Sequence, residues 1–294
     1  MKTVFPGFAI IVWLWLRVQG SSSQYLEPNC GLTFDSSYRM THAKPAGLGR
    51  YPWMAFLHTP TNFKCAGTLI NHWFVLTAAH CFPVTIDLIV RLGEYNRDTP
   101  IDRENSLEMG PTQEYYVDTA FRHKLYDNDD YVHDIGLLKL TMKVEYLPHI
   151  QPICIMVGDN AKWMVNQYSW FMATGWGRTS EEPNAKTSRT LQELRVNRRK
   201  NIDCFLGFQQ RLISEQICAG NDDSNLCEGD SGGPQGRMME IDGEERFVQM
   251  GIASYTKTGC RRISILTNVG MYGDWIKQIV NYYGPKDNRT YSRV

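Results

Sequence analysis

Between about residue 40 and residue 269 the chain is a long series of short apolar or alternating segments. Examples are WMAFLH, WFVLTAA, DIGLLKL and FVQMGIASY, and Gly, Pro, Asn and Asp stand between them. Short runs separated by turn-forming residues are typical of β-strands, and many of them in succession favour a sandwich or a barrel. A chain of 294 residues that is 43% hydrophobic can bury a sizeable core, so the sequence predicts a globular all-β domain.

Helical periodicity is found only at the end of this region. Apolar residues recur at spacings of three and four between Tyr272 and Tyr283, and Gly284-Pro285 follows them. This pattern predicts an amphipathic α-helix whose apolar face packs on the β-structure. A shorter helical turn is expected near Asn201 or Asp203.

The first twenty residues predict export from the cell. An apolar run from Val4 to Leu16 follows one lysine, and Val18-Gln19-Gly20 is suited to cleavage by a signal peptidase. A membrane anchor is the alternative, but the run is shorter than the ~20 apolar residues of a spanning helix, and Arg17 interrupts it. We therefore expect a signal peptide at residues 1–20, a polar propeptide or light chain at residues 21–39, and a secreted protein.

The charge of the chain points to no particular class of partner. Lysine plus arginine and aspartate plus glutamate each number 31. A strong excess of one sign would have indicated nucleic acid, an anionic membrane surface or an acidic substrate. We therefore expect neither nucleic acid nor a membrane among the partners.

Eight cysteines follow the predicted signal peptide, and in an exported protein they are expected to form disulfides. Zinc is a weaker alternative, because the chain has no C-x-x-C pair and the cysteines are far apart in sequence. Eight cysteines allow about 105 pairings, and the sequence alone does not choose among them. The eight are Cys30, Cys65, Cys81, Cys154, Cys204, Cys218, Cys227 and Cys260.

Three separated segments carry a histidine, an aspartate and a serine in surroundings that suit nucleophilic catalysis. They are T-A-A-H-C around His80, D-I-G-L-L from Asp134 onward, and G-D-S-G-G-P around Ser231. A serine hydroxyl becomes a good nucleophile when an imidazole accepts its proton, and the imidazole needs a carboxylate that fixes its tautomer. The order His, Asp, Ser excludes an esterase of the α/β-hydrolase kind, in which the serine comes first. We predict that the three residues form a catalytic triad.

These three motifs resemble those of the trypsin and chymotrypsin family, and the likeness covers about residues 40–283. The segments C-E-G-D-S-G-G-P and R-Y-P-W-M-A-F-L are similar to those of secreted, haemolymph-type insect proteases, and the single cysteine of the propeptide leaves no room for a clip domain. The resemblance implies two packed antiparallel six-stranded β-barrels, with the triad in the cleft, and a C-terminal helix. It implies a serine endopeptidase that works through an acyl-enzyme. Residues 284–294 would form a tail.

The resemblance also implies four disulfides and three further roles. The disulfides would join Cys30 to Cys154, Cys65 to Cys81, Cys204 to Cys218 and Cys227 to Cys260. The backbone N–H groups of Gly229 and Ser231 would form the oxyanion hole, where negative charge develops on the scissile carbonyl. Ser254 would support the carboxylate of Asp134 and line the substrate strand, with an ordinary strand serine as the alternative.

Members of this family are zymogens, and the activation segment of this chain departs from the usual sequence. Cleavage would fall after Arg39, and the new amine of Met40 would pair with Asp230. The residues after the cut are Met-Thr-His-Ala, where the family usually has Ile-Val-Gly-Gly. Methionine replaces isoleucine at a modest cost, but Ala43 lacks the backbone freedom of glycine. We therefore expect activation to be inefficient.

The specificity pocket departs from that of trypsin-like members as well. Asn225 stands six residues before the nucleophile, where those members carry the aspartate that selects Arg or Lys. A cationic side chain buried beside Asn225 would lose its water without gaining a counter-charge. Thr256 and Ser264 stand where roomy pockets have glycine. We therefore expect cleavage after small or modest-sized uncharged residues.

A pocket that does not favour arginine is not expected to cut the chain's own activation bond after Arg39. The hypothesis that follows is an extracellular cascade, in which an upstream trypsin-like protease activates this one. Its other partners would be a protein substrate and an inhibitor such as a serpin. Asn288 begins an Asn-Arg-Thr sequence and is a candidate N-glycosylation site in the tail.

Metal binding has little support in the sequence. Glu94 and Glu104 are spaced like the end ligands of the calcium loop in some family members, but Ile101 replaces the middle acid. Calcium and a solvated charged loop are both open at this position, and no other cofactor is expected. The remaining histidines have no metal-ligand spacing and are interpreted as surface or packing residues; they are His42, His58, His72, His123, His133 and His149.

A second function of a different class stays open beside the protease. A protease-like regulatory or binding protein uses the same fold for contacts and hydrolyses little or nothing. Met40 and Ala43 favour that alternative, whereas the intact triad opposes it.

Overall fold

The computed structural model describes residues 24–33, 44–83, 87–180, 182, 184–241, 243–257, 259–260 and 262–285. Several sequence predictions lie outside these residues and stay predictions. They are the signal peptide, the cleavage site between Arg39 and Met40, the residues His42 and Ala43, and the glycosylation site Asn288.

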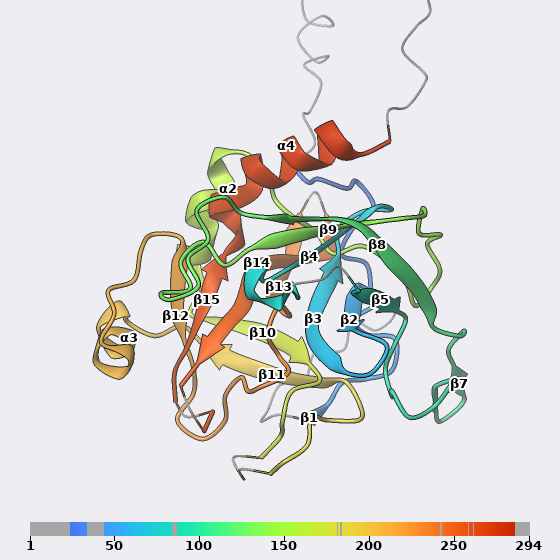
Figure 1. Ribbon diagram of the computed structural model, residues 1–294, viewed down its shortest axis with the longest axis horizontal. Coiled ribbons are helices and arrows are strands. Elements are labelled where there is room, and N and C mark those ends of the chain that lie inside the picture. Colours follow the sequence, from blue (N-terminus) through green and yellow to red (C-terminus); the bar gives the residue numbers. More distant parts are fainter. Residues whose placement is uncertain are drawn as a thin grey trace, which may run out of the picture.

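The first half of the described chain forms a closed antiparallel barrel (Figure 1). Its strands follow the order β2-β3-β4-β9-β8-β5, and β5 pairs back with β2. Each strand coincides with a short apolar or alternating run of the sequence, and buried side chains such as Leu57, Phe74 and Leu92 fill the interior. The strands are β2 (Met54–His58), β3 (Phe63–Leu69), β4 (Phe74–Thr77), β5 (Ile89–Leu92), β8 (Gln113–Arg122) and β9 (Gly136–Leu140).

The second half forms a seven-stranded antiparallel sheet in the order β1-β11-β10-β13-β14-β15-β12. The sheet curls, and its two ends are joined by one isolated bridge between Arg198, directly after β11, and Ala219 of β12. The prediction of two β-barrels is confirmed in this form: one bridge closes the second barrel, and β1 is an added edge strand. The strands are β1 (Lys44–Pro45), β10 (Trp170–Gly175), β11 (Gln192–Asn197), β12 (Gln216–Ala219), β13 (Pro234–Ile241), β14 (Glu244–Thr256) and β15 (Ser264–Asn268).

Short helices and one hairpin complete the fold. The C-terminal helix α4 coincides with the predicted amphipathic segment (Figure 1). Its Ile276 is buried in the core cluster of the first barrel. Helix α3 begins at Asn201, where the sequence predicts a helical turn. No described helix is long and apolar enough to cross a membrane. The elements are η2 (Ala79–Cys81), α2 (Asp159–Met164), η3 (Val165–Gln167), α3 (Asn201–Phe208), η4 (Val269–Tyr272), α4 (Gly273–Tyr283), and the β6 (Arg103–Glu104) and β7 (Leu107–Glu108) hairpin.

Four disulfides join the cysteines in the pairs that the family resemblance implies. The bond between Cys30 and Cys154 ties the N-terminal segment 24–33 to the body of the protein. Gly31 fits there because a Cβ atom would lie 2.6 Å from the carbonyl oxygen of Phe247, and its φ of +71° also favours glycine. The segment is therefore packed against the body of the protein, and the disulfide keeps it attached even if the chain is cut after residue 39.

Candidate active site

His80 is held on the first barrel by the short helix η2 and by the neighbouring disulfide. The bond between Cys65 and Cys81 ties η2 to strand β3. The Nδ1 atom of His80 lies 2.7 Å from Oδ2 of Asp134, and the backbone N–H of His80 donates to Oδ1 at 3.0 Å. A carboxylate can only accept here, so Nδ1 carries the proton and Nε2, on the far side of the ring, can accept one.

Asp134 is fully buried, and its position is fixed from both barrels. Besides the two bonds from His80, its carboxylate accepts a hydrogen bond from the hydroxyl of Ser254 on β14. The hydroxyl of Thr267 on β15 donates to the backbone carbonyl of Asp134 at 2.8 Å. A buried carboxylate needs such donors to offset the loss of water. Ser254 therefore lies beside the carboxylate of Asp134, which is where the family resemblance places it.

Ser231 lies on the turn that leads into β13, at the junction of the two barrels. Its carbonyl accepts a hydrogen bond from the N–H of Ala66 on β3 at 2.8 Å, and the next residue, Gly232, donates to Ala253 on β14 at 2.8 Å. Gly232 has φ +79°, and a Cβ atom there would lie 2.1 Å from the hydroxyl of Thr77. Only glycine fits this close approach. The structure thus brings the loop of Ser231 between the elements that carry His80 and Ser254.

The turn also presents backbone donors. Within the part of the chain that the structure describes, the N–H groups of Gly229 and Ser231 donate to no protein group. Gly229 has φ +99°, and a Cβ atom there would lie 2.9 Å from Thr187 and 3.0 Å from Gly177. Unpaired N–H groups held by a rigid turn can stabilise negative charge on a carbonyl oxygen.

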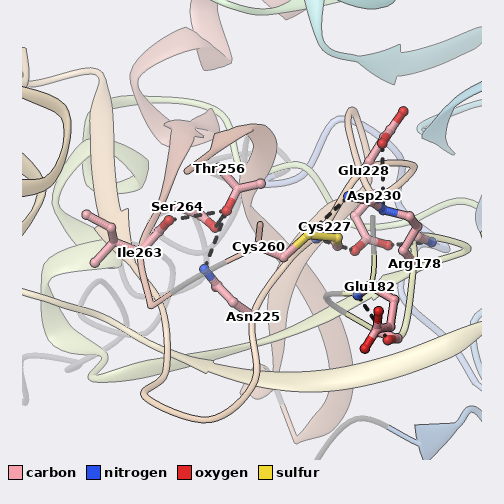
Figure 2. Close-up of a disulfide and its surroundings, with 12 residues drawn as sticks. Arg178, Glu182, Asn225, Cys227, Glu228, Asp230, Thr256, Cys260, Ile263 and Ser264 are labelled. Atoms are coloured by element: carbon pink, nitrogen blue, oxygen red, sulfur yellow. Dashed lines mark hydrogen bonds and ion pairs between the residues drawn. A yellow bond between two sulfur atoms is a disulfide. The ribbon is translucent and has the colours of Figure 1, made fainter. Parts of the chain in front are cut away.

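The three residues predicted to form the specificity pocket lie together and bind one another (Figure 2). The hydroxyl of Ser264 donates to Oγ1 of Thr256 at 3.1 Å, and Nδ2 of Asn225 approaches the same oxygen at 3.5 Å. The Thr256 hydroxyl donates to the carbonyl of Ile263 at 3.2 Å. Side chains therefore occupy space that glycines would leave open. Oδ1 of Asn225 is buried and has no hydrogen-bond partner among the described residues.

Asp230 lines a cavity of about 120 Å³ together with Gly175, Gly177 and Arg178, and Asn225 of the cluster also lines it. The carboxylate of Asp230 accepts hydrogen bonds from the N–H of Gly177 at 2.8 Å and of Cys227 at 2.9 Å. A Cβ atom on Gly175 or Gly177 would collide with it. Burial raises the pKa of Asp230 to about 6, although the two backbone hydrogen bonds act in the opposite direction. A positive charge placed in this cavity would stabilise the carboxylate.

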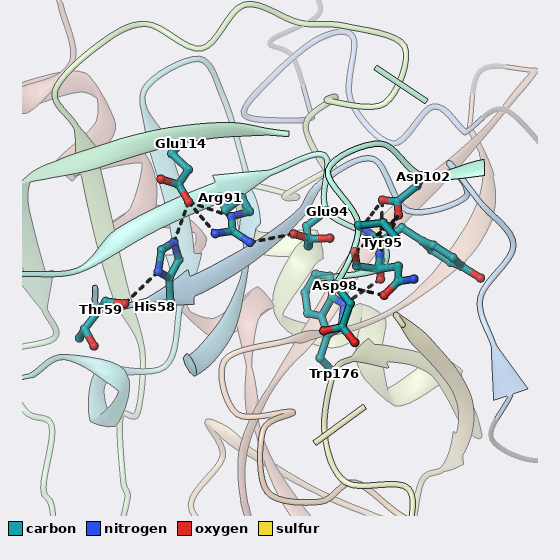
Figure 3. Close-up of polar contacts among 11 residues, drawn as sticks. His58, Thr59, Arg91, Glu94, Tyr95, Asp98, Asp102, Glu114 and Trp176 are labelled. Atoms are coloured by element: carbon teal, nitrogen blue, oxygen red, sulfur yellow. Dashed lines mark hydrogen bonds and ion pairs between the residues drawn. The ribbon is translucent and has the colours of Figure 1, made fainter. Parts of the chain in front are cut away.

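The loop that resembles a calcium site is held by protein groups (Figure 3). Arg91 donates to Glu94 at 3.0 Å and to Glu114 at 2.8 Å. The carboxylate of Asp102 accepts from the N–H groups of Tyr95 and Asn96 and from the hydroxyl of Thr99. Arg91 binds Oε2 of Glu94 and the loop donors bind both oxygens of Asp102, whereas Oε1 of Glu94 is buried without a hydrogen-bond partner among the described residues.

Glu104, the other expected calcium ligand, accepts a hydrogen bond from the N–H of Leu48 at 3.0 Å. Burial raises the pKa of Glu94, with Arg91 acting in the opposite direction.

Among the described residues, the one group of three His, Cys, Asp or Glu ligands close enough to hold a metal is Cys65, His80 and Cys81. The two sulfurs of that group are joined in a disulfide, so it is not a metal site.

An aromatic shelf beside His80 was missed by the sequence analysis. The ring of Tyr131 contacts that of His80 edge-on at 5.6 Å, and Tyr255 lies 5.0 Å from Tyr131. Phe208 of α3 lies 5.0 Å from Tyr255 on its other side. Tyr131 stands three residues before Asp134, and Tyr255 follows Ser254, so each adjoins a motif. Because Tyr131, Tyr255 and Phe208 are far apart in sequence, the sequence did not predict that their rings would lie together.

Comparisons with known proteins agree with this geometry. A family model described as Trypsin matches residues 41–276. "Serine protease grass" of Drosophila melanogaster is 33% identical over 256 residues, which cover 82% of this chain and 67% of that protein. "Phenoloxidase-activating enzyme 1" of Spodoptera litura is 32% identical over 288 residues, which cover 89% and 74%. The crystal structure of the Drosophila Grass clip serine protease of the Toll pathway has a TM-score of 0.77 at 30% identity, over 89% of this chain and 76% of that chain.

Proposed function

The chain belongs to the trypsin family and is a serine-type endopeptidase; from this premise we propose that His80, Asp134 and Ser231 are its catalytic triad. The observation that carries the proposal is the set of bonds that fixes His80. The imidazole Nδ1 of His80 is bonded to the fully buried Asp134, the backbone N–H of His80 donates to the same carboxylate, and Ser254 holds that carboxylate in turn. A base fixed in this way is what a serine nucleophile requires.

The reaction would proceed in two halves. His80 Nε2 takes the proton of the Ser231 hydroxyl while Oγ bonds to the scissile carbonyl carbon, and the N–H groups of Gly229 and Ser231 stabilise the oxyanion. The C–N bond then breaks, and the amine leaves with the proton from His80, which gives an acyl-enzyme. In the second half His80 takes a proton from water, the hydroxide attacks the ester, and Ser231 regains its proton.

Activation would follow cleavage after Arg39. The amine of Met40 would enter the cavity beside Asp230 and give its carboxylate a positive partner, which lowers the raised pKa of Asp230. The disulfide between Cys30 and Cys154 would keep residues 21–39 on the mature enzyme as a light chain.

The proposed substrate preference follows from the hydrogen-bonded cluster of Asn225, Thr256 and Ser264. The cluster contains no carboxylate, and its side chains narrow the space for the residue before the scissile bond. An arginine or lysine there would be buried without a counter-charge, which is unfavourable by several kcal/mol. Small or modest-sized uncharged residues fit best.

The proposed setting is an extracellular cascade. The predicted signal peptide favours secretion, and the relatives include a protease of the Toll pathway and an enzyme named for activating phenoloxidase. An upstream trypsin-like protease would cut after Arg39, because the enzyme's own pocket does not favour arginine. A protein would be the substrate, with a serpin as a candidate inhibitor. Self-activation of the purified precursor would contradict this scheme.

Calcium is not part of the proposed mechanism. Arg91 binds one oxygen of Glu94, and donors of the loop bind the carboxylate of Asp102. We propose that these contacts shape the loop without a metal ion. The triad chemistry itself needs no cofactor.

The decisive experiment is active-site labelling after controlled cleavage. The substitutions Ser36→Ile, Ser37→Glu and Tyr38→Gly create an Ile-Glu-Gly-Arg sequence, so that factor Xa can cut after Arg39. A fluorophosphonate probe should then label Ser231 only in the cleaved protein, and a matched Ser231→Ala precursor should stay unlabelled. No labelling after complete cleavage would favour the alternative of a protease-like regulatory protein, for which the Met-Thr-His-Ala terminus is the main argument.

A further inference from the structure

Two arginines lie on one tryptophan at the surface of the second barrel. Trp170 begins β10, which lies between β11 and β13 in the sheet. Arg195 comes from β11, and its guanidinium carbon lies 4.7 Å from the centre of the Trp170 ring. Arg237 comes from β13 and lies 3.8 Å from the same ring and 4.6 Å from that of Tyr168. Stacking of this kind holds a guanidinium plane in a fixed orientation while its edges stay available to a ligand.

Neither arginine has a carboxylate partner among the described residues. Most arginines with a defined contact in this protein are paired with acids, as Arg103 is with Glu108 and Arg189 with Asp98. At Trp170 the two guanidinium groups repel each other: burial lowers the pKa of Arg237, and the charge of Arg195 acts in the same direction. Nε of Arg237 is buried without a hydrogen-bond partner. An anion beside the exposed Arg195 and the partly exposed Arg237 would relieve this repulsion.

The positive surface continues beyond the tryptophan. Tyr168 also lines a shallow groove formed by residues 166–169 and 198–201. The groove carries the sequence Arg198-Arg199-Lys200, in which Arg199 is paired with Asp222 and Arg198 bonds to the neutral side chain of Asn166. Lys200 is exposed. The chain as a whole has no net charge. The surface strip made of Arg195, Trp170, Arg237 and residues 198–200 is therefore a local excess of positive charge.

The strip is remote from the catalytic cleft. Gly175, which abuts the carboxyl group of Asp230, ends β10, and Trp170 begins it. Five residues of a strand span roughly 16 Å. A ligand on the strip would leave the cleft open.

We propose that Arg195, Trp170 and Arg237, together with the groove from residue 198 to residue 200, bind a sulfated polysaccharide. The strip offers several cations in a row and no deep pocket, which suits a linear polyanion. Planar guanidinium forks match the paired oxygens of sulfate groups. Sulfated glycans are the polyanions that a secreted protein meets outside the cell, so the choice among polyanions rests on the proposed secretion. The binding itself does not depend on catalysis.

The test uses the full chain carrying Ser231→Ala and heparin as the sulfated probe. Binding is measured by titration calorimetry at several NaCl concentrations. The double substitution Arg195→Gln and Arg237→Gln should weaken binding roughly 10- to 100-fold and reduce the slope of log Kd against log salt by about two. The control, Arg103→Gln with Arg189→Gln, removes the same charge from exposed, acid-paired arginines and should bind within about two-fold of the parent.

A second measurement needs no substitution. Phenylglyoxal modifies accessible arginines, and heparin should slow its reaction at Arg195 and Arg237 but not at Arg103 and Arg189, as read by peptide mass spectrometry. Equal losses in the two double variants, or no protection at Arg195 and Arg237, would overturn the site. Equal or tighter binding of polyglutamate or single-stranded DNA would overturn the assignment to a sulfated polysaccharide. Because the parent carries Ser231→Ala, failure of the proposed catalysis would affect none of these results.

Discussion

Replacing Asp230 by asparagine should change the stability of the uncleaved precursor in a way that depends on pH. The pKa of this carboxyl is raised from 3.8 to about 6 in the folded protein by burial. The folded state therefore holds the proton more tightly than the unfolded state, and stability falls as pH rises from about 4 to about 6. A shift of about two units corresponds to roughly 3 kcal/mol, which is lost fully above pH 6 and not at all below pH 4.

The substituted asparagine would carry no charge at any of these pH values, so the electrostatic cost disappears. Its single amide oxygen can accept from only one of the two N–H groups, of Gly177 and Cys227, that bind the carboxylate. The unpaired N–H costs about 1 kcal/mol. Asp230→Asn should therefore stabilise the precursor by about 2 kcal/mol at pH 7 and destabilise it by about 1 kcal/mol at pH 4.

Urea denaturation at both pH values would measure this difference. The background is the Ser231→Ala precursor, because it cannot digest itself. An equal effect of Asp230→Asn at pH 4 and pH 7 would refute the reasoning, since only a titrating carboxyl makes the effect depend on pH. In the cleaved enzyme the sign should reverse, because the amine of Met40 would lose its partner; the variant should then be inactive.

The remaining predictions concern the triad, the pocket and the loop. Ser254→Ala should lower kcat about ten-fold with little change in KM, because it removes one donor from Asp134; an unchanged kcat would mean that the bond is not used. Asn225→Asp alone should not create cleavage after arginine, whereas Asn225→Asp with Thr256→Gly and Ser264→Gly should, and a peptide library read by mass spectrometry would separate the two outcomes. EDTA should leave the Tm unchanged, whereas removal of a calcium ion bound at 100 times its Kd would lower it by about 5–10 °C.

The elements that the sequence predicted well are those whose signal is local. The strands of the first barrel coincide with short apolar runs, and α4 with a helical stripe, because each buries one continuous set of neighbouring side chains. Strands β12 and β13 carried no such signal. The first, Gln-Ile-Cys-Ala, contains only one large aliphatic residue, and the second begins Pro-Gln-Gly-Arg, which is typical of a turn.

The triad could be predicted because each member stands in its own recognisable motif. The shelf of Tyr131, Tyr255 and Phe208 and the pair of arginines on Trp170 could not. Their members come from segments far apart in sequence, and only the pairing of strands brings them together. The calcium loop illustrates the converse. Glu94 and Glu104 have a suggestive spacing, but Arg91, three residues earlier, pairs with one oxygen of Glu94, a contact that the spacing did not predict.

The same energies decide whether the unusual N-terminus can activate the enzyme. Ionised Asp230 is unfavourable in the uncleaved fold by roughly 3 kcal/mol, and pairing with the amine of Met40 can recover up to that amount. Methionine in place of isoleucine costs up to about 1.5 kcal/mol, and alanine in place of glycine at position 43 costs on the order of 1 kcal/mol where the backbone needs glycine. These costs are differences from the Ile-Val-Gly-Gly terminus of the family, and together they offset much of the electrostatic gain, so the inserted terminus should be less populated than it would be with Ile-Val-Gly-Gly. A bound substrate favours the ordered pocket, so partial insertion should raise KM relative to a Met40→Ile, Ala43→Gly variant and leave kcat at saturating substrate unchanged.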